Sequence, residues 1–389
     1  MGVRGWVAAA LAVVVAGAAV YLGTALLDAP ERGEIRATLS AVEALAGEDT
    51  VGYARAEGPV PFDFPADHGP HPDYRTEWWY FTGNLAGEGG RRFGYQLTFF
   101  RNSLAPESAP RVSAWNTNQL WMAHLAVTDV EAGVHLHAER FGRGAVGLAG
   151  ADSIPLRVWV GDWRLAETGE GDGSPFPLLL HAQEGDWGIE LEVEGGKPPV
   201  LQGEAGWSRK GPEPGNASYY FSHTRMPTRG NIRLGGDAWE VEGDSWMDRE
   251  WSTSALSEEH VGWDWFSLQL TREVEIMFFQ LRREDGASDP LNHGVLVEPD
   301  GSYRSLEADD VTIEVLERWG SPLDGTEYPV AWRMRIPAEE LDLRIRAPVV
   351  DQEMNLSVRY WEGAVDVEGE RAGEVVGGVG FVEMTGYGG

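Results

Sequence analysis

Three segments of the chain alternate strictly between apolar and polar residues. The run "GIELEVEG" (188–195) sets Ile189, Leu191 and Val193 against three glutamates. The runs "AWRMRI" (331–336) and "LDLRIRA" (341–347) repeat the pattern, with arginine and aspartate between the apolar residues. Because successive side chains of a β-strand point to opposite faces of its sheet, each run predicts a strand with one buried and one solvated face.

Less regular runs of the same kind recur along the chain after residue 90. They lie between clusters of Gly, Pro, Asn and Asp, at 93–101, 119–130, 156–165, 176–183, 218–223, 261–270 and 274–282. With 50 glycines and 22 prolines as punctuation, they predict an all-β fold of antiparallel sandwiches or barrels. The segment 31–46 differs, because its apolar residues have helical spacing and predict one short helix.

A stretch with Pro and Gly indicates where the chain divides. The segment "MPTRGNIRLGGD" (226–237) interrupts two strand-rich halves, and no convincing sequence repeat relates the halves. A length of 389 residues exceeds the usual size of one domain. We therefore predict two β domains at 58–232 and 233–389, preceded by a linker with the short helix at 29–57.

The N-terminal region carries an uncharged apolar run at residues 6–27. At about 1.5 Å per residue, such a run is long enough to cross a bilayer core of about 30 Å. Arg4 precedes the run and Asp28, Glu31 and Glu34 follow it, which by the positive-inside rule places the bulk of the chain on the periplasmic side of the inner membrane. We predict a membrane anchor within 1–28, with a cleaved signal peptide and secretion as the alternative.

The net charge of −31 argues against a nucleic-acid partner. Phosphate binding needs clustered Lys and Arg, whereas 31 Lys and Arg stand here against 62 Asp and Glu. We interpret the excess as a solvated acidic surface that keeps the protein soluble. The chain has no cysteine, so neither a lipid-bearing cysteine nor a disulfide holds it in place.

The stretch "HPDYRTEWWYFTGNL" (71–85) places a carboxylate beside four aromatic residues. In a strand, Glu77 and Trp79 share one face, and Trp78 and Tyr80 share the other. If the first face points inward, Glu77 lies in an aromatic cavity, where desolvation raises the pKa of a carboxyl group and favours a proton donor. The alternative is a structural Glu77 that pairs with Arg75 or with a distant arginine while the aromatic residues form core.

Two further segments combine acids with aromatic residues, and a third adds aromatic residues without an acid. In "GDSWMDREWSTS" (243–254), Trp246, Asp248 and Glu250 share one strand face. Two tryptophans flank an aspartate in "GWDWF" (262–266), and "YYFSH" (219–223) adds tyrosines and a serine. Together with an unusual total of 17 tryptophans, these segments predict an aromatic site that contains carboxyl groups.

Other kinds of chemistry have little support. His135 and His137 would share a strand face, but no third ligand has recognisable spacing, so we predict no metal site. The sequence contains no P-loop and no GxGxxG between a strand and a helix, which argues against a nucleotide site. It also lacks a GxSxG elbow, which argues against a serine hydrolase.

Six segments together are similar to a known family. They are "FPADHGPHPDYRTEWWYFTGNL" (64–85), "YYFS" (219–222), "SWMDREW" (245–251), "GWDWF" (262–266), "YWEG" (360–363) and "GFVEMTGY" (380–387). Over residues 52–388 the chain resembles the AttH-like branch of the carotenoid 1,2-hydratase (hydroxyneurosporene synthase) family, often labelled predicted secreted hydrolases. The resemblance implies two lipocalin-like antiparallel β-barrels packed side by side, and an activity without a cofactor.

The resemblance also implies a site. The family's hydratases add water across a C=C bond of an acyclic carotenoid, and Asp248 falls where they carry the acid proposed for them. Trp246 replaces a tyrosine of their motif, and Tyr220 and Ser222 replace a histidine and a tryptophan. We expect the candidate acids to be Asp248, Glu77 and Glu250, and the ligand-binding residues to be Trp78, Trp79, Tyr80, Tyr220, Ser222, Trp246, Trp263 and Trp265.

Two functions compete on this basis. The changed residues around Asp248 favour a membrane-anchored, extracytoplasmic lipocalin-like protein that binds a lipid or isoprenoid, accessory to an ABC transporter permease of the kind often associated with AttH-like members. The retained Asp248 favours the alternative, a hydratase-like lyase. In it a carboxylic acid protonates the C=C bond and aromatic rings stabilise the carbocation. Hydrolysis is the weakest of the three hypotheses.

Overall fold

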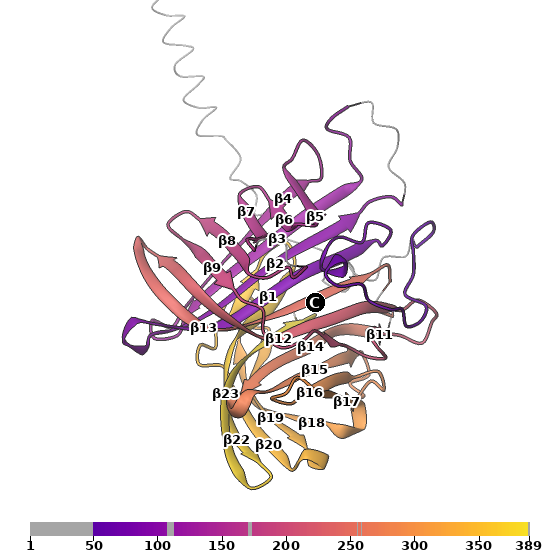
Figure 1. Cartoon of the computed structure of the whole chain (residues 1–389). Coiled ribbons are helices and arrows are strands. Elements are labelled where there is room, and N and C mark those ends of the chain that lie inside the picture. The colour runs from indigo at the N-terminus through magenta and orange to yellow at the C-terminus, as the bar shows by residue number, and fades with distance from the viewer. Residues whose placement is uncertain (1–49, 107–112, 170–172, 255, 258, 388–389) are drawn as a thin grey trace, which may run out of the picture. The chain divides into compact units, whose positions relative to one another are not determined.

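The computed structural model describes residues 50–387 except 107–112, 170–172, 255 and 258, and this part of the chain consists of strands and loops (Figure 1). Its helices are single 3-10 turns, at Ala66–His68 (η1), Glu88–Gly90 (η2), Thr271–Glu273 (η3), Ala308–Asp310 (η4) and Pro337–Glu339 (η5). The all-β prediction is therefore confirmed. No helix in these residues has the length and apolar character needed to cross a membrane. The expected anchor at 1–28 and the expected helix at 31–46 lie outside the described residues.

The first antiparallel sheet is formed by β1 (Thr76–Gly87), β2 (Arg92–Ser103), β3 (Gln119–Asp129), β4 (Val134–Arg143), β5 (Ala149–Ser153), β6 (Leu156–Val160), β7 (Trp163–Glu167), β8 (Leu178–Glu184), β9 (Trp187–Val193), β10 (Val200–Leu201), β11 (Trp207–Arg209), β12 (Ala217–Leu234) and β13 (Asp237–Ser252). The strand order is β4-β3-β2-β1-β13-β12-β9-β8-β7-β6-β5, and β10 and β11 pair with β12 (Figure 1).

The second antiparallel sheet is formed by β14 (His260–Leu270), β15 (Val274–Arg283), β16 (His293–Val297), β17 (Tyr303–Glu307), β18 (Thr312–Gly320), β19 (Glu327–Ile336), β20 (Leu341–Arg346), β21 (Glu353–Asn355), β22 (Arg359–Arg371) and β23 (Glu374–Thr385). The strand order is β17-β16-β15-β14-β23-β22-β20-β19-β18, and β21 pairs with β22.

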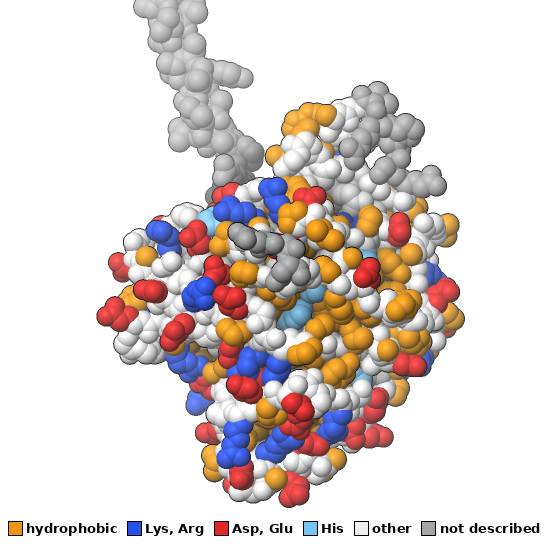
Figure 2. Space-filling view, viewed as in Figure 1, with side chains coloured by type: hydrophobic (Ala, Val, Ile, Leu, Met, Phe, Trp, Pro, Cys, Tyr) orange, Lys and Arg blue, Asp and Glu red, His pale blue; other side chains and the backbone are white. Residues whose placement is uncertain are grey.

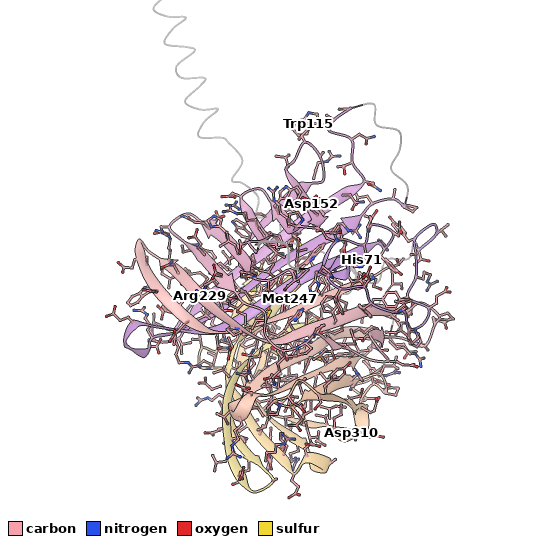
Figure 3. All side chains as sticks on the ribbon, in the orientation of Figure 1. His71, Trp115, Asp152, Arg229, Met247 and Asp310 are labelled. Carbon is pink, nitrogen blue, oxygen red and sulfur yellow. The ribbon has the colours of Figure 1, made fainter. Side chains whose placement is uncertain are left out.

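Each sheet encloses an apolar core of its own. The core of the first sheet includes Trp79, Phe81 and Met247, of which Met247 is labelled in Figure 3. The core of the second sheet surrounds Trp332 and Trp361. Both sheets are therefore barrel-like, as the lipocalin-like prediction requires.

A third apolar cluster joins the two sheets. Tyr80 and Trp246 of the first sheet pack in it against Trp265 of the second, with ring centroids 5.2 and 6.2 Å from that of Trp265. Because side chains alternate along a strand, β1 places one set of aromatic residues in the first core and the other set between the sheets. Both faces of β1 are thus buried along most of its length.

The boundary expected at residue 232 falls inside a hairpin of the first sheet. β12 and β13 pair from Ser218 and Ser252 down to Leu234 and Asp237, and β13 also pairs with the whole length of β1. The segment 226–237, which the sequence analysis interpreted as a boundary, is the end of β12 followed by a tight turn. In this turn Gly235 and Gly236 have φ angles of 60° and 92°, which residues other than glycine rarely adopt. The chain changes sheet after Ser252, so residues 233–252 belong to the first sheet rather than to the second domain.

The strand pattern follows the alternation in most places. β9, β19 and β20 contain the three strictly alternating segments, and the apolar residues of β20 are buried while Arg344 and Arg346 are exposed. The run 156–165 is two strands, β6 and β7, because Gly161 makes a turn with φ of 65°. On the face seen in Figure 2, acidic and basic side chains are interspersed over the surface, as expected for a solvated exterior.

Candidate functional site

A partly enclosed cavity of about 150 Å³ lies between the two sheets, outside both barrel cores. A cavity of about this size can hold a group as large as benzene. Its wall is formed by β1, β2, β3, β12 and β13 of the first sheet and by β14, β15, β22 and β23 of the second. The aromatic residues that line it are Trp78, Tyr80, Phe100, Tyr220, Trp263, Trp265, Phe279 and Tyr360.

Asp248 is one of the two acids that the first sheet contributes to the wall of this cavity. It lies on β13, opposite Tyr80 of β1 and Ser222 of β12, and only 4% of it is exposed. Ser222 Oγ donates a hydrogen bond to Oδ1 of Asp248 at 2.5 Å, and Trp246 Nε1 donates to the same oxygen at 2.7 Å. The hydroxyl of Tyr220 donates to Oδ2. These three donors fix the orientation of the carboxyl group.

Burial raises the pKa of Asp248 from 3.8 to about 7. Desolvation is the largest cause, since a charged carboxylate is costly in an apolar surrounding. The hydrogen bonds from Ser222, Tyr220 and Trp246 lower the pKa, and the neighbouring Glu250 raises it further. At neutral pH a large fraction of Asp248 therefore holds a proton inside an aromatic cavity.

Glu250 and Lys210 form the charged corner of the cavity. The Nζ atom of Lys210 lies 3.6 Å from Oε1 of Glu250 and 3.8 Å from the ring centroid of Phe279. Burial lowers the pKa of Lys210, while the carboxyl groups of Glu250 and Asp248 raise it. Glu250 is thus in the cavity as expected, and it lies beside a lysine that the sequence pattern did not indicate.

Two further carboxyl groups enter the cavity from the second sheet. Glu362 of β22 and Glu383 of β23 are direct neighbours across the two strands, and both line the cavity. Sequence analysis did not select them, although they stand within the family-like segments "YWEG" and "GFVEMTGY". One sequence feature could have indicated them, namely a single glutamate among apolar residues in each of the two strands. A strand that is buried on both faces tolerates a glutamate only where it has a partner or a function.

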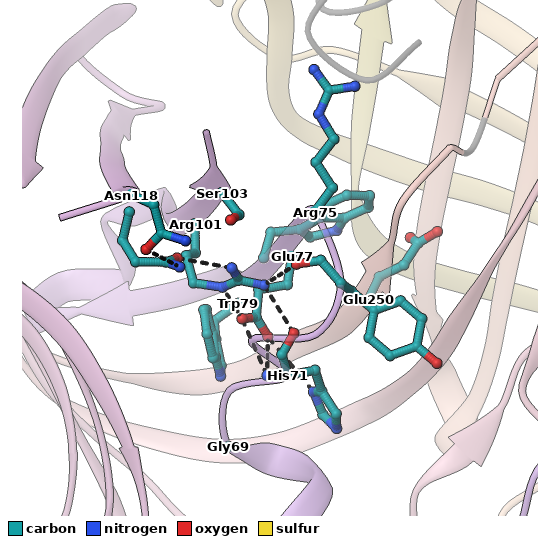
Figure 4. A network of polar contacts seen from close by, with 12 residues as sticks. Gly69, His71, Arg75, Glu77, Trp79, Arg101, Ser103, Asn118 and Glu250 are labelled. Atoms are coloured by element: carbon teal, nitrogen blue, oxygen red, sulfur yellow. Dashed lines mark hydrogen bonds and ion pairs between the residues drawn. The ribbon is translucent and has the colours of Figure 1, made fainter. Parts of the chain in front are cut away.

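Glu77 is not among the residues that line this cavity. It lies in a network of polar contacts on the other face of β1 from Trp78 and Tyr80 (Figure 4). Its carboxylate accepts hydrogen bonds from Arg101 and Arg249 and from the backbone N–H of His71, the last at 2.9 Å. Although burial would raise the pKa of Glu77, the two guanidinium groups hold it well below its ordinary value. Glu77 is therefore ionised and ion-paired at neutral pH, which matches the structural alternative with distant arginines and does not suit a proton donor.

The expected ligand-binding residues divide into three groups. Trp78, Tyr80, Tyr220, Trp263 and Trp265 line the cavity. Ser222 and Trp246 contact Asp248 directly. Trp79 lies in the first barrel core, stacked on Trp121 with centroids 5.9 Å apart, and its indole donates to the backbone carbonyl of His68 at 2.7 Å. Residues 77 and 79 thus form the structural face of β1, and residues 78 and 80 form the face toward the cavity.

A family model described as AttH-like matches residues 55–387. The chain belongs to the AttH-like family. This confirms the family resemblance, and a putative AttH from Nitrosomonas europaea has the same fold, with 32% sequence identity and a TM-score of 0.75 over 86% of this chain and 99% of that one. A comparison with curated protein sequences gave no match.

Two more distant solved structures resemble this AttH-like chain in fold. Kievitone hydratase from Nectria haematococca is 14% identical with a TM-score of 0.65, and the match covers 86% of this chain and 96% of the hydratase. CghA in complex with Sch210972 is 13% identical with a TM-score of 0.50, over 89% of this chain and 97% of CghA. At these identities the likeness extends to the fold alone.

Proposed function

We propose that this AttH-like protein is a hydratase-like enzyme that adds water to a C=C bond of a hydrophobic ligand held between the two sheets. The observation that carries the proposal is Asp248, a buried carboxyl group with a pKa raised to about 7 in an aromatic cavity. Likeness in fold to a protein named a hydratase supports the same reading. The alternative of the sequence analysis is therefore preferred to the transporter-accessory role, for which the described residues offer no supporting observation.

The first step requires an acid that can protonate carbon. Asp248 would give its proton to one carbon of the double bond, whose π electrons form the new C–H bond and leave positive charge on the other carbon. General acid catalysis of this kind contributes roughly 10²–10⁴-fold in rate, and it works best when the pKa of the acid lies near the working pH. Ser222, Tyr220 and Trp246 would then stabilise the Asp248 carboxylate by the hydrogen bonds they already donate.

The second step requires a surrounding that tolerates a carbocation. Trp78, Trp263 and Trp265 line the cavity, and an indole face attracts a desolvated cation by about 2 kcal/mol. Water then supplies the oxygen of a new C–O bond and loses a proton to a carboxylate. The net change is the addition of one water molecule, with no oxidation or reduction.

The size of the cavity limits the part of the ligand that reacts inside it. A volume of about 150 Å³ fits a group of benzene size, such as one end of a longer molecule. A terminal C=C unit of an acyclic isoprenoid meets this requirement if the remainder extends out of the opening. The proposed substrate class is therefore a hydrophobic chain with an unsaturated end.

Incubation of the full chain with acyclic carotenoids dispersed in detergent, and separately with kievitone, tests the proposal by mass spectrometry. The native chain should add one water to a probe, and Asp248→Asn should reduce the rate by at least about 100-fold. Asp264→Asn is the matched control, because Asp264 is a buried aspartate of β14 in the second sheet that instead contacts Tyr387 and Arg282. Equal rates for Asp248→Asn and the native chain would remove Asp248 from the reaction.

Membrane anchoring at 1–28 and an ABC permease partner stay predictions. If the native chain adds no water to any probe but an isoprenoid or lipid co-purifies with it, the protein is a carrier and its acids are structural. Purification from native membranes in mild detergent would reveal both the bound compound and any permease that accompanies it.

A further inference from the structure

Glu362 and Glu383 form a pair of carboxyl groups on the cavity wall that faces Asp248. Directly opposed residues of antiparallel strands have Cβ atoms about 5 Å apart, so the two side chains project side by side. Glu362 is only 1% exposed. The pair comes from the second sheet, whereas Asp248 comes from the first, so the three acids border the cavity from two sides.

The pair has polar partners but no cation within the described residues. The hydroxyl of Tyr80 donates to Oε1 of Glu362 at 2.5 Å, and the indole of Trp263 donates to Oε1 of Glu383 at 3.1 Å. The other oxygen of Glu362, Oε2, is buried and has no hydrogen-bond partner in the described part of the chain. A buried carboxyl oxygen without a partner on a cavity wall is costly unless a ligand or water occupies the cavity beside it.

The surrounding titratable groups do not neutralise two negative charges. They are Tyr80 of β1, His124 of β3, Lys210, Tyr220 of β12, Asp248 and Glu250 of β13, and Tyr360 of β22. Burial lowers the pKa of His124 to about 3, so this residue is neutral at pH 7. Lys210 is then the cation of the cavity wall, and its amino group is paired with Glu250.

Glu362 is buried and Glu383 is half-buried, and two such adjacent carboxylates without a cation cannot both be ionised at low energetic cost. Burial, and then the charge of Glu383, raise the pKa of Glu362 well above its ordinary value. Burial also raises the pKa of Glu383, and the charges of Asp248 and Glu250 raise it further. At neutral pH the pair therefore retains at least one proton, and the two groups titrate as a unit.

We propose that Glu362 and Glu383 share one proton and form the second acid–base centre of the cavity, in which Oε2 of Glu362 takes the proton of the attacking water. This role rests on the proposed hydration. As the water oxygen bonds to the carbocation, its O–H proton moves to Oε2, and the pair holds two protons. One of them then passes to the carboxylate of Asp248, which restores the starting state of both centres.

The contacts of each acid indicate why Glu362 accepts a proton from water while Asp248 protonates the alkene. Asp248 already accepts three hydrogen bonds, which stabilise it as the carboxylate left after proton donation. Glu362 has a free oxygen for a water molecule and a Tyr80 hydroxyl that holds its other oxygen. Two carboxyl groups with different surroundings can thus act as acid and base in one cavity.

The shared proton is measured first, by the infrared C=O band of protonated carboxyl groups as the pH rises from 7 to 10. In the native full chain a band should persist above pH 8, where Asp248 is largely ionised. Its disappearance should shift to lower pH by about one unit or more in Glu362→Gln and in Glu383→Gln. Glu368→Gln, an exposed glutamate of the same strand β22, is the matched control and should leave the band unchanged. An unchanged band in both pair variants overturns the shared proton.

The role in water addition is measured in deuterated water with an alkene probe. Glu362→Gln should lower hydration by about 100-fold or more while the unreacted alkene still gains deuterium, because Asp248 continues to protonate carbon reversibly. Asp248→Asn should lose both signals. Hydration by Glu362→Gln at the native rate overturns the base role. If the native chain hydrates no probe, the proposed function fails together with the base role, whereas a shifted infrared band still establishes the shared proton.

Discussion

The Asp248→Asn variant is expected to gain stability relative to the native chain as the pH rises from about 4 to about 7. In the unfolded chain an aspartate ionises near pH 3.8, whereas in the folded chain the pKa of Asp248 is about 7. Between these values the folded state binds one proton more than the unfolded state, so the native chain loses stability as the pH rises. Asparagine is neutral at every pH and removes this loss.

The magnitude follows from the two pKa values. A difference between 3.8 and about 7 corresponds to about 4 kcal/mol, since each pH unit is worth about 1.4 kcal/mol. Only 4% of Asp248 is exposed, so solvent screening does not reduce this figure much. Asp264 provides a comparison with a smaller shift, because burial raises its pKa only to about 6. The stability of Asp264→Asn relative to the native chain should therefore rise by about 3 kcal/mol, and this rise should end near pH 6.

Urea unfolding of the full chain in mild detergent, followed by tryptophan fluorescence at pH 4 to 8, measures these differences. The free energy of unfolding of Asp248→Asn minus that of the native chain should rise with pH and level off above about pH 7. A difference that stays constant from pH 4 to 8 would refute the reasoning, because Asp248 would then be ionised in the folded chain as it is in the unfolded chain.

Three further substitutions test other parts of the structure. Glu77→Gln leaves Arg249 buried without its carboxylate and should cost about 3–5 kcal/mol in urea unfolding. Trp265→Leu removes an indole from the cavity wall and should weaken binding of an isoprenoid probe about tenfold by fluorescence titration. Gly363→Ala would bring a Cβ atom to 2.2 Å from the side chain of Gln352 and should lower thermal stability by about 1–3 kcal/mol.

Each of these predictions has a contrasting result. Native stability of Glu77→Gln would mean that the ion pairs around residue 77 are not needed for the fold. Trp115 is 60% exposed and does not line the cavity, so Trp115→Leu is the control for Trp265→Leu. Equal losses of affinity in the two variants would show that the probe does not bind specifically in the cavity. An unchanged melting temperature for Gly363→Ala would show that Gln352 moves aside without cost.

The class of the fold was predictable because alternation is a local property. In β9 and β20 each apolar residue faces a core and each polar residue faces solvent, so the period of two is plain in the sequence. The place of β13 was not predictable in this way, since its pairing with β1 joins residues far apart along the chain. A Pro- and Gly-containing hairpin resembles a domain boundary when only its local composition is known.

The candidate site was predictable in part for a related reason. Alternation correctly grouped Trp78 with Tyr80 and Glu77 with Trp79, but both faces of β1 are apolar. Sequence alone therefore could not tell which face forms the barrel core and which meets the second sheet. Glu362 and Asp248 come from different sheets and line the same cavity, and no spacing in the sequence encodes a cavity between two sheets.

The most direct test of the account is hydration of an acyclic isoprenoid by the full chain in water labelled with heavy oxygen, with the product analysed by mass spectrometry. The account predicts one labelled oxygen and one added solvent hydrogen per product in the native chain and in Asp264→Asn, and loss of this product in Asp248→Asn. A native chain that forms no labelled product, or an Asp248→Asn variant that forms it at the native rate, would contradict it.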